Sequence, residues 1–138
     1  ANRPSVGRGA AFGDLDNDGD IDAVIANNNE PANLLIRDGT PNGNWIGFNL
    51  VGTKSNRDAI GARALIETSE TTQTKYINTA GSYLAANDKR LLFGLGDNSS
   101  VKTITIQWPN GQSNVYSNLK SNRYYQIIEG GEISEYHY

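Results

Sequence analysis

Five aspartates fall within nine residues near the start of the chain, in Asp14-Leu15-Asp16-Asn17-Asp18-Gly19-Asp20-Ile21-Asp22. Carboxylates this close together repel one another unless a cation lies among them. Calcium is bound by oxygen atoms from alternating positions of such a loop, with a glycine at the sixth position for the sharp turn. The spacing therefore predicts a calcium site with carboxylates from Asp14, Asp16, Asp18 and Asp22 and a backbone carbonyl from Asp20.

The alternative is a solvated acidic turn, because Asp, Asn and Gly are also frequent in ordinary loops. A helix–loop–helix calcium site does not fit, because Ile25 occupies the place where that site needs a glutamate. The flanking segments, Ala10-Ala11-Phe12-Gly13 and Ala23-Val24-Ile25-Ala26, lack helical spacing. We therefore expect the loop to join two short strands.

The sequence gives little support for a catalytic site. The chain has a single histidine, His137, and no cysteine, so nucleophilic, zinc and redox-metal sites lack their usual groups. A hydrolase could use paired carboxylates, but the remaining glutamates have no motif around them; they are Glu67, Glu70, Glu129, Glu132 and Glu135. The sequence therefore predicts a protein that is not an enzyme.

The charge and the apolar stretches of the sequence limit the classes of partner that the protein can have. The formal net charge is −3, and the basic residues are scattered without a basic helix, which argues against nucleic-acid binding. No apolar stretch approaches the roughly 20 residues of a membrane-spanning helix. The chain begins at Ala1 and contains no methionine, so we interpret it as part of a longer multidomain protein.

The composition predicts an all-β protein, because 15 glycines and many turn residues separate short apolar runs. Alternation is clearest at Ile104, Ile106 and Trp108, which are expected to face a core. The expected strands are 22–27, 33–37, 44–51, 61–68, 73–79, 90–94, 101–108, 113–117 and 124–129, with a last one at 133–138.

Turn motifs suggest how these strands are organised. Pro109-Asn110-Gly111 is typical of a hairpin, and Pro41-Asn42-Gly43 marks a junction. We expect an N-terminal calcium-loop hairpin over residues 1–42 and an antiparallel sandwich or jelly-roll-like domain over residues 43–138.

A ligand site is predicted in the loop around Tyr83, which lies near the polar residues Asn87, Asp88 and Arg90. Loop aromatics contact ligands more often than buried ones do, and they stack on sugars or anchor protein partners. The predicted partner is therefore a protein or a carbohydrate.

The segment from Gly9 to Asp22 resembles an FG-GAP or VCBS-type repeat, and Asn33-Leu34-Leu35-Ile36-Arg37-Asp38-Gly39 resembles the strand that closes such a unit. The resemblance covers about residues 7–40. The family usually has many such repeats in a propeller, whereas this chain shows one. The resemblance to this repeat implies a calcium-binding loop.

The remainder is similar to the ASPIC/UnbV domain over about residues 44–130, which follows such repeats in secreted bacterial proteins. The similarity rests on Trp45-Ile46-Gly47-Phe48, Gly61-Ala62-Arg63, Gly81-Ser82-Tyr83-Leu84, Phe93-Gly94-Leu95-Gly96, Trp108-Pro109-Asn110-Gly111 and Ile127-Ile128-Glu129-Gly130. It implies a secreted or cell-surface location. We expect a non-catalytic calcium-binding module for adhesion or recognition. The alternative is an accessory or catalytic domain of a secreted hydrolase with structural calcium.

Overall fold

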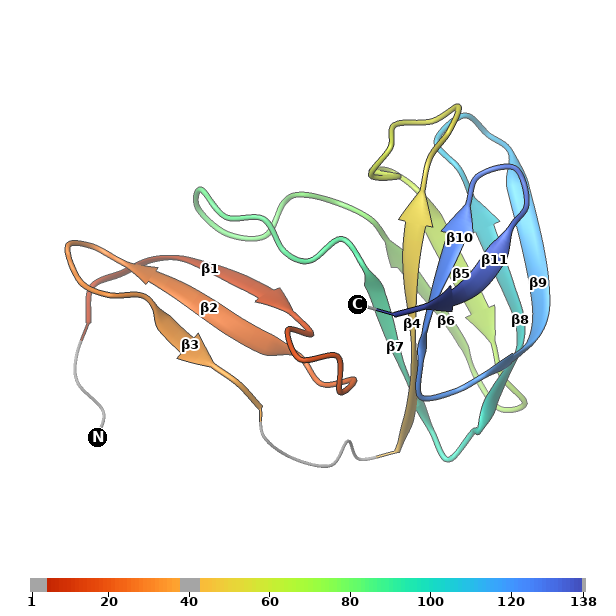
Figure 1. Ribbon diagram of the computed structural model, residues 1–138, viewed down its shortest axis with the longest axis horizontal. Coiled ribbons are helices and arrows are strands. Elements are labelled where there is room, and N and C mark those ends of the chain that lie inside the picture. The colour runs from red at the N-terminus through yellow and green to blue at the C-terminus, as the bar shows by residue number, and fades with distance from the viewer. Residues whose placement is uncertain (1–4, 38–42, 138) are drawn as a thin grey trace. The chain divides into compact units, whose positions relative to one another are not determined.

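The computed structural model describes residues 5–37 and 43–137, which form strands and turns without a helix (Figure 1). In that part of the chain there is accordingly no long apolar helix of the kind that crosses a membrane. The prediction of an all-β protein is confirmed.

The chain folds into two compact units. The first combines Ala1–Thr40 with Thr79–Asp88, and the second combines Pro41–Asn78 with Lys89–Tyr138. The predicted junction near residue 42 lies outside the described residues. The predicted division into 1–42 and 43–138 assigns residues 79–88 to the second part, whereas in the structure Thr79–Asp88 groups with the N-terminal residues.

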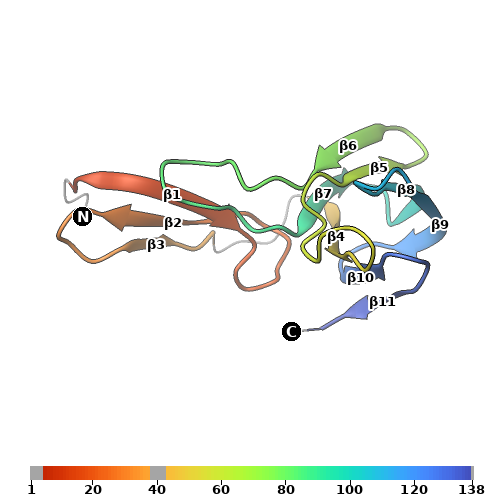
Figure 2. The same ribbon diagram turned by 90° about the horizontal axis from the view of Figure 1, so that it is seen from above.

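The first unit contains a three-stranded antiparallel sheet in the order β1-β2-β3. Its strands are β1 (Gly7–Gly13), β2 (Asp22–Asn27) and β3 (Asn33–Leu35). The aspartate-rich segment connects β1 to β2, so the predicted pair of short strands around this loop is confirmed. Residues from Thr79–Asp88 run along β1 (Figure 2).

The second unit consists of two four-stranded sheets, in the orders β11-β10-β4-β7 and β6-β5-β8-β9. The predicted sandwich is confirmed, but it is not wholly antiparallel, because β4 and β10 pair in parallel. A long stretch of chain separates these two strands, so no hairpin fixes their direction. The strands are β4 (Asn44–Val51), β5 (Arg63–Glu67), β6 (Thr72–Tyr76), β7 (Leu91–Gly96), β8 (Ser100–Gln107), β9 (Ser113–Lys120), β10 (Tyr124–Ile128) and β11 (Ile133–Tyr136).

The core lies between these two sheets and follows from period-two alternation. Ile46 and Phe48 point inward from β4, and Ile104 and Ile106 point inward from β8, all fully buried. Trp108 joins the same cluster, as its spacing predicts. Removing this apolar surface from water is the main stabilising contribution to the unit.

A buried carboxylate joins three connections of the second unit. Glu129 Oε2 accepts hydrogen bonds from the backbone N–H groups of Thr53, Lys54 and Ser55 at 2.8, 2.7 and 2.7 Å. Its Oε1 accepts from the Ser55 hydroxyl at 2.8 Å and the Asn110 side-chain amide at 2.6 Å. The β4–β5, β8–β9 and β10–β11 connections thus meet at one side chain.

These contacts set the protonation of Glu129. Burial alone raises the pKa of the carboxyl group, but the hydrogen bonds from Ser55, Thr53 and Lys54 favour the charged form and lower the pKa to about 2. The folded pKa therefore lies below the ordinary value of 4.5. Glu129 therefore stabilises the folded state at pH values above its ordinary pKa. This stabilisation is lost as the pH falls toward the pKa of Glu129 in the folded state.

We predict that the melting temperature falls as the pH is lowered from about 4.5 toward about 2, and that Glu129→Gln flattens this acid dependence. At neutral pH the Gln variant should melt at least about 5 °C lower, because its amide N–H₂ would face backbone donors. Thermal denaturation at several pH values is the measurement. Equal acid dependence in the two proteins would contradict the role given to Glu129.

Candidate metal centre

The connection between β1 and β2 is folded around the first aspartate. The Asp14 carboxylate is buried and accepts hydrogen bonds from the backbone N–H groups of Asp18 at 3.1 Å and Gly19 at 2.9 Å. Asn17 and Gly19 both have positive φ, at 64° and 94°, which closes the turn. Glycine adopts this conformation without steric cost, so Gly19 occupies the position that the loop pattern requires.

The last aspartate fixes the ends of the connection. Asp22 is buried, and its two oxygens accept hydrogen bonds from the backbone N–H groups of Leu15 at 2.8 Å and Arg37 at 2.9 Å. The Arg37 guanidinium lies 3.3 Å from Asp20 Oδ1. Among the described residues no donor reaches the buried Oδ2 of Asp20. Two carboxylates therefore hold this end of the sheet together through the backbone and an arginine.

Three of the predicted ligands converge. Asp14, Asp16 and Asp18 each offer a carboxylate oxygen, and these atoms lie within 4.8 Å of one another. Desolvation raises the pKa of Asp16, and repulsion from Asp18 and Asp22 raises it further. An oxygen-only set at this spacing can hold one hard cation, which would remove that repulsion. The residues present thus fit a metal of this class.

The other two predicted ligands have different surroundings. Asp22 is not part of the converging group, and both of its oxygens hold backbone N–H groups. For Asp20 the prediction concerned the backbone carbonyl, while its side chain pairs with Arg37. Their assignment as ligands remains a prediction, and their visible contribution is to the shape of the loop.

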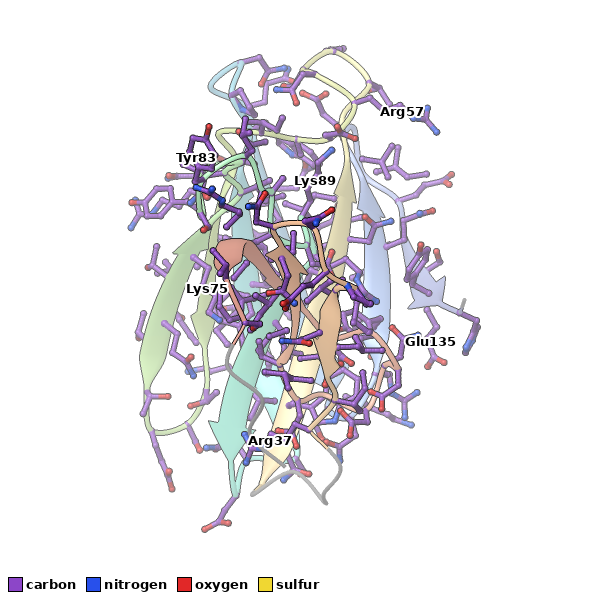
Figure 3. All side chains as sticks on the ribbon, turned by 90° about the vertical axis from the view of Figure 1, so that its left-hand side faces the viewer. Arg37, Arg57, Lys75, Tyr83, Lys89 and Glu135 are labelled. Carbon is purple, nitrogen blue, oxygen red and sulfur yellow. The ribbon has the colours of Figure 1, made fainter. Side chains whose placement is uncertain are left out.

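The predicted ligand loop combines residues with separate roles. The Asn87 side chain accepts a hydrogen bond from the Phe12 N–H at 3.1 Å, and the Asp88 N–H donates to the Phe12 carbonyl at 2.9 Å. Tyr83 is 70% exposed, and its side chain is labelled in Figure 3. Arg90 belongs to the second unit, where its guanidinium lies 4.6 Å from the centre of the Tyr124 ring. Asn87 and Asp88 therefore attach the loop to β1, and Tyr83 is its accessible side chain.

Two features of the structure were not predicted from the sequence. The role of Glu129 was not predicted, because its donors come from Thr53–Ser55 and Asn110, which are distant from it in sequence. Leu84 is 90% exposed beside Tyr83, in a position where an apolar residue suggested nothing unusual. No local sequence signal could have identified the role of Glu129. The exposure of Leu84, by contrast, follows from interpreting its loop as a turn.

A comparison with protein families adds an independent finding. The family model described as ASPIC and UnbV matches residues 52–134, from just after β4 into β11. This confirms the ASPIC/UnbV prediction with bounds shifted toward the C-terminus. The predicted FG-GAP or VCBS repeat at 7–40 lies outside the match and remains a prediction. No match was found among curated proteins. Because the matched residues make up more than half of the sequence, the chain belongs to the ASPIC and UnbV family.

Proposed function

We propose that this chain is a calcium-binding, non-catalytic recognition module that works outside the cytosol. The observation that carries the proposal is the convergence of Asp14, Asp16 and Asp18, whose carboxylate oxygens lie within 4.8 Å of one another. The Asp14 hydrogen bonds to the loop backbone support it, because they preset the fold of the loop before an ion arrives. Such preorganisation lowers the cost of binding.

The donor set favours calcium over other ions. Carboxylate and carbonyl oxygens suit hard cations, whereas zinc and copper prefer the nitrogen and sulfur of His and Cys. Magnesium keeps several waters and is seldom held by a dedicated protein loop. Calcium would supply positive charge among the carboxylates, and Asp14, Asp16 and Asp18 would hold it. Asp22 and Arg37 would keep the strand ends in place around the loop.

The exposed loop beside this sheet supports a recognition role. Tyr83 and Leu84 are 70% and 90% exposed, and contacts to Phe12 and Ala10 attach their segment to β1. Aromatic side chains presented by an anchored loop are frequent anchors in binding surfaces. The proposed ligand is a protein or a glycan, bound without chemical turnover. An extracellular or cell-surface setting fits, because calcium is abundant there.

We predict that isothermal titration calorimetry will show one bound calcium with a dissociation constant on the order of 0.1–1 mM, the range of extracellular modules. Asp16→Asn should weaken binding by about tenfold or more, because it removes a charged ligand while keeping the size of the side chain. The exposed residue Asp97 of the second unit provides a matched control, so Asp97→Asn should bind calcium like the wild type. Equal affinity in all three proteins would place the ion elsewhere.

Calcium affinity should also decrease as the pH is lowered from about 7 toward about 4. Binding needs charged carboxylates, and the pKa of Asp16 is raised above its ordinary value of 3.8. Protons therefore compete for Asp16 at a higher pH than for an ordinary aspartate. Titrations at several pH values test this. An affinity that is constant over this range would show that Asp16 is not a ligand.

Removing calcium with a chelator should loosen the first unit selectively. That unit has none of the buried hydrophobic side chains of the described residues, so its sheet depends on the loop contacts. Hydrogen exchange should accelerate in residues 5–37 and 82–88 and change little in residues 89–137. Unchanged exchange in the first segments, or an equal increase throughout the chain, would contradict the proposed role of the ion.

A further inference from the structure

The turn at Ser82–Ala85 presents two apolar side chains at a cost in stability. Ser82 and Ala85 form an isolated β-bridge, and between them Leu84 has a φ of +50°. Glycine or asparagine takes this conformation easily, whereas a leucine is strained there. Leu84 is also 90% exposed, so its side chain gains nothing from burial within this chain. A residue that is both strained and exposed points to a binding role.

The turn is held firmly on β1. The Ser82 hydroxyl accepts a hydrogen bond from the Ala10 N–H at 3.3 Å, and Asn87 accepts one from the Phe12 N–H at 3.1 Å. A Cβ atom added at Gly9 would lie 2.5 Å from the Tyr83 carbonyl oxygen, so the backbone of the turn rests directly against this glycine. The side chains of the turn are therefore preorganised, which lowers the entropy lost on binding.

A groove lies between this turn and one face of the sheet. Ala11 is the direct cross-strand partner of Val24, so their side chains share a face, and both line the groove. Tyr83 and Leu84 line it from the turn, and its volume is about 590 Å³. All of these residues belong to the first unit.

Among the described residues that line the groove, Arg8 is the charged one. Among the described residues Arg8 pairs with no carboxylate, so its guanidinium is available to an acidic group. The other lining residues are small, apolar or aromatic, apart from Asn28. The charge complementarity therefore favours an occupant that carries an acidic group next to an apolar one.

We infer that this groove binds an extended polypeptide segment of a partner protein, with a bulky apolar side chain against Ala11, Val24 and Tyr83 and a neighbouring carboxylate on Arg8. This inference rests on the proposed recognition function and names its partner class. A glycan would need polar groups around each ring, and the side chains of the described lining residues offer Arg8, Asn28 and the Tyr83 hydroxyl. A fatty acyl chain would leave much of its length in water beside side chains as exposed as Leu84.

The first step of the test is selection of a displayed library of random dodecapeptides on the full chain with excess calcium. Enriched peptides should contain Asp or Glu beside Leu, Ile, Phe or Trp. A synthetic copy of the most enriched peptide and a second copy with Asn or Gln in place of the acid are then measured by fluorescence anisotropy. The wild type should prefer the acidic peptide by about tenfold.

The variants separate the groove from general stability. Leu84→Gly and Tyr83→Ala should each weaken binding by about tenfold or more, as expected for interface anchors. The glycine variant should melt no lower than the wild type, because glycine relieves the strain at this φ. Arg8→Gln should abolish the preference for the acidic peptide. Val115, which is 61% exposed on β9, gives the control Val115→Ser, which should bind like the wild type.

Three results would overturn the inference. The first is that no peptide is enriched, and the second is that enriched peptides bind Leu84→Gly and Tyr83→Ala as tightly as the wild type. The third is Leu84-dependent binding of arrayed glycans or of oleate without any binding of peptide. The calcium proposal fails separately. If calorimetry detects no calcium binding while the peptide still depends on Leu84 and Arg8, the groove stands and the metal site falls.

Discussion

The sheet of the first unit has to keep its shape without a hydrophobic core. All buried hydrophobic side chains of the described residues lie in the second unit, while Phe12, Leu34 and Leu35 of the first are each about half exposed. What remains is polar: Asp14 and Asp22 bind the loop backbone, and Ser82 and Asn87 bind β1. A unit stabilised in this way is sensitive to the charge state of its carboxylates. This sensitivity is why an ion at the loop would affect more than the loop itself.

The second unit uses carboxylate chemistry in a different way. Its two sheets enclose a continuous apolar core, and the charge of Glu129 is stabilised by hydrogen-bond donors rather than by a cation. Each Glu129 oxygen faces N–H or O–H groups, so the charged form is favoured despite burial. In the aspartate loop the carboxylates of Asp14, Asp16 and Asp18 lie close to one another, and Asp14 and Asp18 also accept hydrogen bonds from backbone N–H groups. Donors thus surround the charge of Glu129, whereas in the aspartate loop a bound cation would reduce the repulsion among the carboxylates.

The sequence predicted most of the fold, because alternation and turn residues are local signals. Ile104, Ile106 and Trp108 face the core as expected, and β2 and β4 have the predicted bounds. The parallel pairing of β4 with β10 has no local signal, since it depends on packing between distant segments. The attachment of residues 79–88 to β1 and the donors around Glu129 could not be predicted for the same reason. The spacing of Asp14, Asp16 and Asp18 was enough to bring them together, but it did not indicate that Asp22 would bind two backbone N–H groups.

The proposed metal site and the anchored turn use the same short sheet, since the turn is attached through Ala10 and Phe12 of β1 and the loop begins directly after that strand. Whether an ion occupies the loop is thus the central question. The most direct measurement is a crystal structure of the chain grown with calcium. We predict one ion with oxygens of Asp14, Asp16 and Asp18 at about 2.3–2.6 Å. A loop that contains only water at saturating calcium, or an ion bound by other residues, would contradict the account.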